Sequence, residues 1–369
     1  MRIIQVIQKK QFRGAEVFAA QLSQRLKALG HHVLIICLID GKVELPFDGE
    51  VICIKANIHN RFFDFSAWKL LAERIEEFKP DIVQANASDT LKYTVLSKIL
   101  FRWNAKIVFR NANKLGDFIK SKPHFLLNKW FISKVDFIAS VSNLCKEDFI
   151  KTFNYSPKEI LTLPIGVEDS KQAPYENLTF LGIPLNRKVL LSVASFVPEK
   201  NHVGLISIFR KIHDEHKDTH LLLIGEGKQK ERIMSLVKEY DLNDFVLFTS
   251  ERKDIQLIMP CCNALLMPSH IEGLPAVILE AFISKLPVVA YNVGGIAEVL
   301  NNKTGWLIAK DLENDFADAV CEILNKKNKQ MVEEKLLNAF SLCHNFYLNT
   351  GIASRFSEMY KNLIGKEKN

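Results

Sequence analysis

The residues best suited to chemistry lie in one stretch, IEGLPAVILEA, in which two carboxylates flank a turn and a helix. Glu272 is followed directly by Gly273 and Leu274, and Pro275 stands where a helix would begin. Proline suits the first helical position because its missing N–H would have no intrahelical partner. The free amides of a helix start, together with the helix dipole, form an anion site. Glu280 lies further along the same helix, so the spacing predicts a site for a phosphorylated, hydroxyl-rich ligand.

Other candidates follow buried strands of the same half of the chain. Ser195 and Lys200 lie in the loop after the strand predicted over 189–194, and Lys200, near a helix start, could bind phosphate or simply be solvated. Gly225 opens a Gly-Glu-Gly turn after the apolar run LLLI, and Arg252 follows another strand, where it could meet a nucleobase or remain in solvent. In doubly wound sheets ligands bind beyond the carboxyl ends of the strands, so all four positions are predicted ligand contacts.

The first half of the chain offers a single glycine, Gly14, after its first strand. A dinucleotide-binding dehydrogenase would place GxGxxG here, so hydride transfer is disfavoured. A lone glycine at a helix start permits close backbone approach to a phosphate or sugar, although it can equally serve as a turn.

The sequence predicts no metal and no other cofactor. It contains no DxD pair that would hold a metal against a diphosphate. The run from His213 to His216 ends an amphipathic helix, and zinc sites need ligands that converge on one point. We therefore interpret this run as the polar end of a helix.

The elements that position these residues alternate between strands and helices, which predicts parallel sheets covered on both faces. Predicted strands of the first half cover 2–7, 32–39, 81–85, 106–110 and 137–141, and those of the second half cover 189–194, 220–224, 246–248, 264–267 and 288–291. The fold class is therefore α/β, with two doubly wound Rossmann-like domains and a ligand cleft between them. We predict an N-terminal domain of 1–166 plus a C-terminal helix at about 351–369, and a second domain of 167–350. A polar linker at 168–186 and a loose tail, GKEKN, complete the chain.

The composition further restricts the classes of protein to which this chain can belong. The 369 residues are 48% hydrophobic, with seven cysteines and a net charge of +7 that divides into +9 for residues 1–165 and −2 for the remainder. No apolar run reaches the roughly 18 residues of a membrane span, and the start lacks a signal-peptide layout. Unpaired cysteines favour a cytoplasmic protein. The basic first half favours an anionic partner or surface, or only a soluble lysine-rich face, and no nucleic-acid-binding module accompanies it.

One basic segment, KSKPHFLLNKWFISK at 120–134, mixes lysines with aromatic residues, as interfacial helices do. An ordinary amphipathic helix that packs its aromatic face on the sheet would show the same composition. A peripheral contact with an anionic membrane, at the inner face of the plasma membrane, is therefore one hypothesis for this half.

Taken together and in this order, these segments resemble the retaining nucleotide-sugar glycosyltransferases of the GT-B fold, in particular glycosyltransferase family 4 (glycosyl transferases group 1). The matching segments are RGAEVF, VSNLCKEDF, LPIGVE, SVASFVPEKNH, LLLIGEG, MPSHIEGLPAVILEA, LPVVAYNVGGIAEVL and GWLI. The resemblance covers most of the chain and is strongest at about 189–308.

The resemblance implies specific roles for the second half. The family's EX7E motif falls on Glu272 and Glu280, which places Glu272 at the donor sugar and Glu280 on the ribose. Lys200 would hold the diphosphate, and the amides of Gly273 and Leu274 would contact sugar and phosphate. Glu272 and Lys200 are thus the expected catalytic residues. The first domain, whose glycine loop would meet the diphosphate, would bind the acceptor.

The chain departs from the family at several positions. Ser195 stands where the family often has arginine, so Lys200 or another basic residue must compensate. Many relatives carry histidine in two loops of the first domain, where this chain has Asn86 and the stretch with Asn111 and Asn113. Asparagine can hydrogen-bond an acceptor hydroxyl but cannot act as a titrating base.

The family implies metal-independent transfer of a sugar, with retention, from a UDP- or GDP-sugar to a hydroxyl of a glycan or lipid-linked acceptor, in polysaccharide, O-antigen, capsule or glycolipid biosynthesis. Two alternatives share the architecture. A GT-B sugar-nucleotide epimerase would release a free altered sugar nucleotide, and a non-catalytic protein would only bind a sugar nucleotide or glycan.

Overall fold

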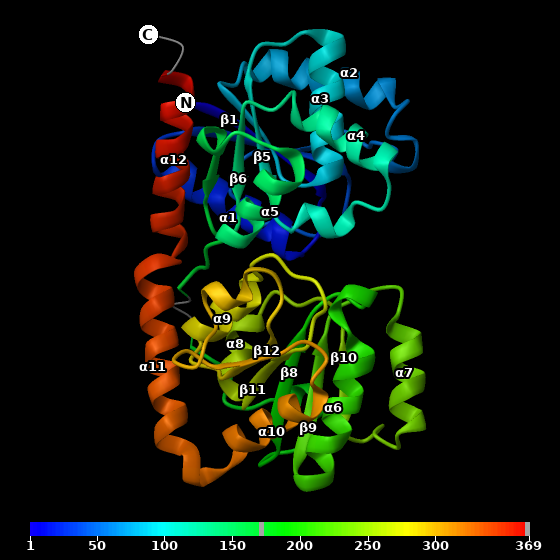
Figure 1. The fold of residues 1–369 in the computed structure, drawn as a ribbon, viewed down its shortest axis with the longest axis vertical. Helices are drawn as coiled ribbons and strands as arrows, with labels where there is room; N and C mark the ends of the chain where they lie inside the picture. Colours follow the sequence, from blue (N-terminus) through cyan, green and yellow to red (C-terminus); the bar gives the residue numbers. More distant parts are fainter. Residues whose placement is uncertain (170–172, 366–369) are drawn as a thin grey trace. The chain divides into compact units, whose positions relative to one another are not determined.

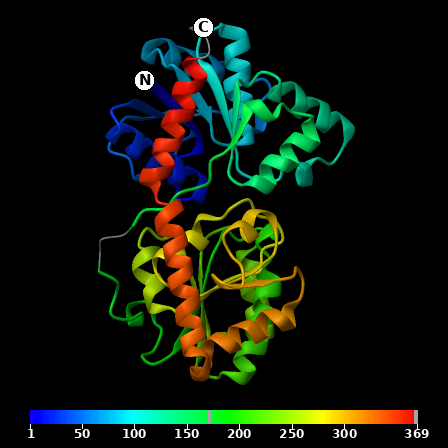
Figure 2. The ribbon, with the colours of Figure 1, turned by 60° about the vertical axis from the view of Figure 1, so that its left-hand side comes forward.

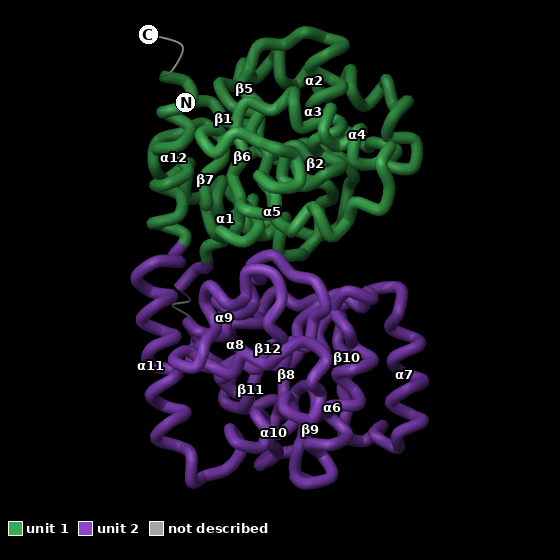
Figure 3. The backbone as a smooth tube through the Cα atoms, in the orientation of Figure 1, with its two compact units in different colours: residues 1–166, 349–369 green, residues 167–348 purple. Residues whose placement is uncertain are grey.

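The computed structural model describes residues 1–169 and 173–365. The chain divides into two compact units (Figures 1 and 3): unit 1 comprises residues 1–166 and 349–369, and unit 2 comprises residues 167–348. Part of the predicted linker, residues 170–172, and most of the predicted tail, residues 366–369, lie outside the described residues.

Unit 1 is built on a parallel seven-stranded sheet in the order β3-β2-β1-β4-β5-β6-β7. Its strands are β1 Arg2–Lys9, β2 His32–Ile39, β3 Val51–Cys53, β4 Ile82–Ala85, β5 Lys106–Asn111, β6 Phe137–Ser140 and β7 Ile160–Thr162. Its helices are α1 Gly14–Ala28, α2 Phe65–Phe78, α3 Ser88–Phe101, α4 Lys122–Ile132, α5 Asn143–Phe153 and α12 Asn349–Gly365. The strands are apolar runs because helices cover both faces of the sheet.

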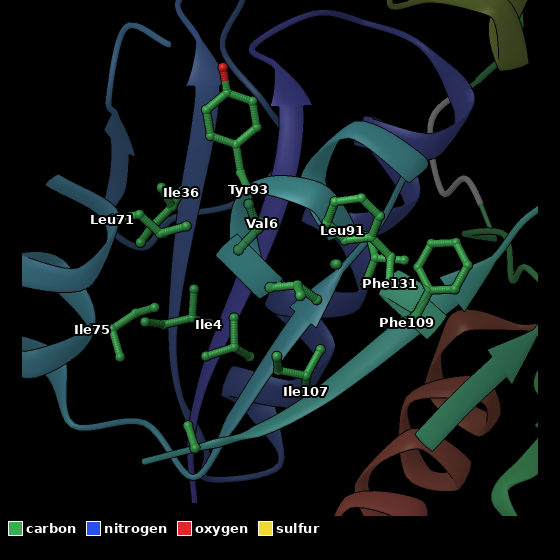
Figure 4. Close-up of a cluster of buried hydrophobic side chains, with 14 of the residues drawn as sticks. Ile4, Val6, Ile36, Leu71, Ile75, Leu91, Tyr93, Ile107, Phe109 and Phe131 are labelled. Carbon is green, nitrogen blue, oxygen red and sulfur yellow. The ribbon is translucent and has the colours of Figure 1, made fainter. Parts of the chain in front are cut away.

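The larger core of unit 1 lies between its sheet and the helices that follow β3, β4, β5 and β6. Figure 4 shows the strand residues Ile4 and Ile36 on the side of the sheet that carries Leu71 and Ile75 of α2. Side-chain caps fix where several of these helices begin, as Ser121 does by accepting a hydrogen bond from the backbone of His124 in α4. On the other face α12 packs against α1, where the rings of Phe18 and Phe356 lie 6.1 Å apart.

Unit 2 holds a parallel six-stranded sheet in the order β10-β9-β8-β11-β12-β13. Its strands are β8 Lys188–Val193, β9 Thr219–Ile224, β10 Val246–Thr249, β11 Ala264–Met267, β12 Val288–Tyr291 and β13 Trp306–Ile308. Its helices are α6 His202–Glu215, α7 Lys230–Glu239, α8 Ile255–Ile258, α9 Ala276–Ile283, α10 Glu313–Leu324 and α11 Lys329–Phe346. The long helix α11, orange in Figure 2, packs against α9.

The predicted α/β class with two doubly wound parallel sheets is confirmed. The main omissions are the three-residue strands β3, β7 and β13, which lie at sheet edges and are too short to show a clear pattern. The last helix begins at Asn349, two residues before the predicted start. Among the described residues, we find no helix long and apolar enough to cross a membrane.

Candidate functional site

The two predicted catalytic residues meet in unit 2. Lys200 Nζ donates a hydrogen bond to Glu272 Oε1 at 2.5 Å, and the side chain of Glu272 is only 6% exposed. The two residues come from the loops after β8 and β11, which are neighbouring strands of the sheet. Parallel pairing thus places an ammonium and a carboxylate side by side at the carboxyl edge, where doubly wound sheets bind ligands.

Asn201 fixes these two loops to each other. Its backbone is left-handed, with φ of 51°, and its side-chain oxygen accepts from the amide of Gly204 to cap α6. The same side chain donates to the carbonyl of Pro268 at 3.1 Å. The amide of His270 also donates to the carbonyl of Glu199 at 2.8 Å. Lys200 is therefore held by contacts on both sides, an arrangement that preorganises its charge.

A second turn supports the Glu272 loop from behind. The amide of Gly295 donates to the carbonyl of Gly273 at 2.6 Å. A Cβ at Gly294, whose φ is +56°, would lie 1.9 Å from the carbonyl oxygen of Glu272. Only glycine permits this approach, so the NVGGIAE segment is explained by backbone packing against the Glu272 loop.

Helix α9 begins one residue later than predicted. Pro275 is the N-cap, with an extended backbone at φ −77° and ψ 129°, and Ala276 is the first helical residue, so the prediction of proline at the first helical position was wrong by one residue. Leu274, also named in the predicted amide site, is buried. Extended geometry at the N-cap is normal and leaves the first helical amides available to an anion.

Glu280 lies one turn into α9, partly buried among the apolar residues Ile278, Leu279, Ala281 and Phe282. Burial raises the pKa of its carboxyl to about 7. A desolvated carboxylate favours a ligand that brings hydroxyl donors to it.

The turn at Gly225 has a structural cause. Its φ is +153°, and a Cβ would lie 2.1 Å from the carbonyl oxygen of Ala194, in the loop after β8. The neighbouring Ser195 is half-buried. Glycine is thus required where the end of β9 passes the end of β8. The predicted ligand contacts of Gly225 and Ser195 stay predictions.

Arg252 already has partners within unit 2. Its guanidinium forms two hydrogen bonds with Asp254, at 2.8 and 2.6 Å, and lies over the ring of Phe180 at 5.7 Å. The hydroxyl of Tyr175 donates to the same carboxylate at 2.8 Å. These hydrogen bonds lower the pKa of the Asp254 carboxyl. The arginine is oriented by a bidentate pair, which leaves its role at a nucleobase a prediction.

Gly14 is the first residue of α1 and is exposed. A Cβ added there would meet nothing within 4 Å, and its φ is outside the left-handed region. The fold therefore gives no reason for glycine at this position, which weakens the interpretation as a turn and leaves close approach of a ligand as the prediction.

The three predicted acceptor-side asparagines differ in their surroundings. Asn86 is buried, donates to Gln5 at 2.9 Å and accepts from Gln84 at 3.0 Å. Asn111 is also buried, and its amide donates to Ser140 and to the carbonyl of Cys145, both at 3.2 Å. Asn113 is exposed. Two of the three amides are thus engaged inside unit 1, and Asn113 remains accessible.

A buried polar network in unit 1, which the sequence did not predict, lies beside Asn86. The hydroxyl of Tyr360, from α12, donates to Gln84 at 2.6 Å and accepts from Gln5. Arg110, at the end of β5, is 2% exposed and lies over the ring of Phe18 at 4.3 Å. Gln84 and Asn86 are two residues apart and so lie on the same face of β4. Because β4 pairs with β1 on one side and β5 on the other, polar side chains of these three strands lie side by side.

Helix α4, within the basic segment 120–134, divides between the two expected roles. Phe131 and Ile132 are buried in the core of unit 1, as an ordinary amphipathic helix requires. Leu126 and Trp130 are 56% and 43% exposed. The helix thus packs one edge on the unit and presents apolar side chains outward.

Two family descriptions match the chain in succession. Residues 12–171 match "Glycosyltransferase Family 4", and residues 176–335 match "Glycosyl transferases group 1". The chain belongs to the group 1 glycosyltransferases. The predicted family is therefore confirmed.

Two of the curated relatives are named as transferases acting on diphospho-undecaprenol-linked sugars. The chain is 30% identical, over 54% of each chain, to "N-acetylgalactosamine-N,N'-diacetylbacillosaminyl-diphospho-undecaprenol 4-alpha-N-acetylgalactosaminyltransferase" of Campylobacter jejuni. It is 26% identical, over 75% of each chain, to "UDP-Gal:alpha-D-GlcNAc-diphosphoundecaprenol alpha-1,3-galactosyltransferase" of Escherichia coli. The chain spans about half the length of the Campylobacter relative. It spans 49% and 38% of the length of two further curated relatives.

A solved structure shares the whole fold. HepE of Anabaena, in complex with UDP and glucose, superposes with a TM-score of 0.84 at 17% identity, covering 98% of this chain and 100% of that one. It is a neighbour in fold, and the GT-B class of the predicted architecture is confirmed.

Proposed function

We propose that the protein transfers a sugar, with retention of configuration, from a nucleotide diphosphate sugar to a hydroxyl of a glycan or lipid-linked acceptor. The observation that carries the proposal is the Lys200–Glu272 pair, held at the carboxyl edge of the unit 2 sheet beside the start of α9. A cation and helix-start amides suit a diphosphate, and a buried carboxylate suits sugar hydroxyls.

In this mechanism the leaving diphosphate takes the place of Glu272 as the partner of Lys200. The ammonium and the first amides of α9 then stabilise the negative charge that develops as the glycosidic bond breaks. Glu272, released from Lys200, accepts hydrogen bonds from the donor sugar, and Glu280 accepts them from the ribose. These groups supply the positive charge and the hydroxyl contacts, so the proposal includes no metal or other cofactor.

Retention is assigned to a front-face route. Retaining hydrolases place two carboxyl groups about 5 Å apart on either side of the bond that breaks. In this proposal Glu272 accepts hydrogen bonds from the donor sugar and Glu280 accepts them from the ribose, so no pair of carboxylates flanks the bond that breaks. The leaving phosphate would instead help to deprotonate the acceptor hydroxyl on the same face of the sugar.

The acceptor proposed is lipid-linked, and α4 is the proposed contact with an anionic membrane at the inner face of the plasma membrane. Two relatives carry diphospho-undecaprenol acceptors in their names. Leu126, Leu127 and Trp130 are exposed on one side of α4 at helical spacing. The segment 119–134 contains four lysines and no acidic residue. Exposed apolar side chains rimmed by lysines suit an anionic lipid surface.

The donor site is tested by thermal shift with a panel of UDP- and GDP-sugars, followed by turnover with the sugar that stabilises the fold. We expect Lys200→Ala and Glu272→Ala to lower turnover by about 10²–10³-fold, the range for a group that stabilises developing charge. Lys217→Ala, which removes a lysine paired with Asp214 on the surface, is the matched control. Unchanged rates in both site variants would overturn the assignment. A free altered sugar nucleotide formed from donor alone would favour an epimerase, and binding without turnover would favour a binding protein.

The membrane contact is tested by co-sedimentation with anionic vesicles at low salt. The triple substitution of Leu126, Leu127 and Trp130 to serine should abolish binding, because each buried apolar side chain contributes about 1.5–3 kcal/mol. The matched control places serine at three exposed apolar residues of unit 2, Leu185, Met234 and Leu337. Wild-type protein that stays in the supernatant, or equal binding by the two triple variants, would contradict the contact.

A further inference from the structure

Three side chains of different chemistry converge where α6 ends. Glu215 is the last residue of α6, His216 follows it, and Cys321 comes from α10, more than a hundred residues later. One carboxylate oxygen, one imidazole nitrogen and the thiol sulfur all lie within 4.8 Å of one another. We propose that this cluster binds a zinc ion that clamps α6 to α10. The proposal does not depend on the proposed function.

The two helices are held in register by contacts further along. Ser207 donates to Glu313 at 2.7 Å, and Lys211 donates to Asn314 at 2.7 Å and pairs with Glu313 at 3.3 Å. Cys321 therefore reaches the end of α6 from a packed helix, and its position does not depend on a loop. Sites built on packed helices hold ligand geometry better than sites on loops.

His216 is similarly fixed by its backbone. Its amide donates to the carbonyl of Ile212 at 2.8 Å, and its own carbonyl accepts from the amide and the hydroxyl of Thr219, at 3.1 and 2.7 Å. The backbone groups of this turn are thus satisfied, and the turn holds the imidazole beside Glu215 and Cys321.

The rest of the histidine-rich run does not join the cluster. His213 is buried, bonds Thr219 through Nδ1 at 3.1 Å and packs on the ring of Phe245. Asp214 pairs with Arg210 and Lys217 on the surface. The run therefore supplies only Glu215 and His216 to the cluster, and Cys321 supplies the donor that the sequence spacing could not reveal.

The donor set selects the metal. Sulfur, imidazole nitrogen and carboxylate oxygen are the ligands of zinc, whereas magnesium and calcium take oxygen ligands. Zn–N, Zn–O and Zn–S bonds of about 2.0–2.3 Å place the donors of a tetrahedral site about 3.3–3.8 Å apart. The side chains need to close by about 1 Å to reach that geometry. Because Glu215 is exposed and the other two are half-buried, water can complete the coordination.

The location indicates a structural role. Helix α6 begins directly after Lys200 and Asn201, and it ends at the cluster, just before β9. Its 14 residues, at about 1.5 Å each, separate the two ends by about 20 Å. The zinc would thus anchor the far end of the helix whose start holds the donor-site loop, and it would take no part in the chemistry there.

The test measures zinc binding by competition with a fluorescent chelator, and the protection of Cys321 by site-resolved alkylation. We expect one zinc per chain, a melting temperature raised by zinc and not by magnesium, and alkylation of Cys321 slowed at least tenfold. Cys321→Ser and His216→Gln should each weaken binding at least tenfold. The matched controls are Cys261→Ser, at a half-buried cysteine elsewhere in unit 2, and His344→Gln, at an exposed histidine of α11.

The alkylation measurement uses wild-type protein, so it stands even where a variant folds poorly. Zinc that binds without protecting Cys321, or that binds the site and control variants equally well, would be an adventitious ion only and would overturn the proposal. Equal stabilisation by magnesium would also contradict the assignment of zinc, because magnesium does not favour a thiolate ligand.

Discussion

The two units treat a cation at the carboxyl edge of their sheets in opposite ways. In unit 2, Lys200 lies in a loop beyond the strands and pairs with Glu272 at 2.5 Å. In unit 1, Arg110 belongs to a strand and is 2% exposed, and its Nε and Nη1 atoms have no hydrogen-bond partner. The paired lysine can exchange its carboxylate for a ligand phosphate with little loss. The desolvated charge of the buried arginine instead lowers the stability of unit 1, and other contacts in the unit must compensate for it.

The compensation for Arg110 comes from its neighbours. Its guanidinium lies over the ring of Phe18 at 4.3 Å, a contact that favours a desolvated cation. Burial lowers its pKa to about 10, and the carboxylate of Glu16 opposes that change. The same burial raises the pKa of Glu16, although its hydrogen bond with Gln11 and the charges of Arg13 and Arg110 lower it in part. Both charges are therefore poorly solvated.

The two units also differ in what their strand-end glycines do, and this difference predicts the largest effect on stability. Gly225→Ala in unit 2 should destabilise the protein by about 3 kcal/mol or more, because its Cβ would lie 2.1 Å from a backbone carbonyl at a φ of +153°. Gly14→Ala in unit 1 should be neutral or stabilise by up to about 1 kcal/mol, because its Cβ would meet no atom. Urea unfolding of both variants measures the difference.

Activity separates the two glycines in the other direction. If Gly14 admits a ligand to the backbone, Gly14→Ala should lower kcat/KM at least tenfold while the fold stays intact. Full activity in Gly14→Ala would show that the glycine loop of unit 1 is not a ligand contact, and equal stability losses in the two variants would break the contrast between the units.

A smaller effect concerns the buried carboxyl of Glu280. Its pKa is raised from 4.5 to about 7 by burial, so the native state binds a proton that the unfolded state releases. This contribution is complete below about pH 4.5, falls as the pH rises to 7 and stays lost above it. Glu280→Gln should therefore leave stability at pH 4 unchanged and raise it by up to about 3 kcal/mol at pH 8.

Denaturant titrations at pH 4 and pH 8 measure this change in the free energy of unfolding. The control is Glu298→Gln, which changes a glutamate outside α9. The affinity of the wild-type protein for the donor should rise with pH while this contribution to stability falls, because ribose hydroxyls need the ionised carboxylate as acceptor. Binding that is equally tight at pH 5.5 and pH 8 would remove Glu280 from the proposed ribose contact.

The sequence predicted the parts of the site that depend on local pattern. Glu272, Glu280 and Lys200 stand at fixed distances from strand ends, so alternation of strands and helices placed them at one edge of one sheet. The pairing of Lys200 with Glu272 was not predictable in this way, because it depends on β8 and β11 being neighbours although β9 and β10 lie between them in sequence. Their adjacency comes from the order of the strands.

Unit 1 was harder to predict for a related reason. The polar network joins Gln5 and Gln84 to Tyr360 of the last helix, across more than 270 residues. Within each strand a single glutamine carries no signal, because it shows neither a motif nor a helical period. Asn86 was predicted at the acceptor because many relatives carry histidine in that loop, whereas the structure gives its amide internal partners. Long-range burial of polar groups leaves little trace in local spacing.

The smallest expected effect tests whether Arg110 is a cost to the fold. Arg110→Met replaces the guanidinium that lies over Phe18 with an uncharged apolar chain, and should stabilise unit 1 by about 1 kcal/mol, since replacing buried charges by apolar groups of similar volume is often stabilising. The change also withdraws the charge that lowers the pKa of Glu16. Without that charge the pKa of the Glu16 carboxyl rises further and its ionised form becomes more costly to bury, so the gain should shrink as the pH rises.

The double variant Arg110→Met, Glu16→Gln isolates that interaction. It should keep the gain at pH 5 and lose its pH dependence, whereas Glu16→Gln alone leaves the arginine without its nearest carboxylate and should destabilise. Urea unfolding of the four proteins at pH 5 and pH 8 closes the cycle. A destabilisation by Arg110→Met at both pH values would mean that the guanidinium is net stabilising where it lies. Unit 1 and unit 2 would then differ in how they pair their cations, but not in what the cations contribute to stability.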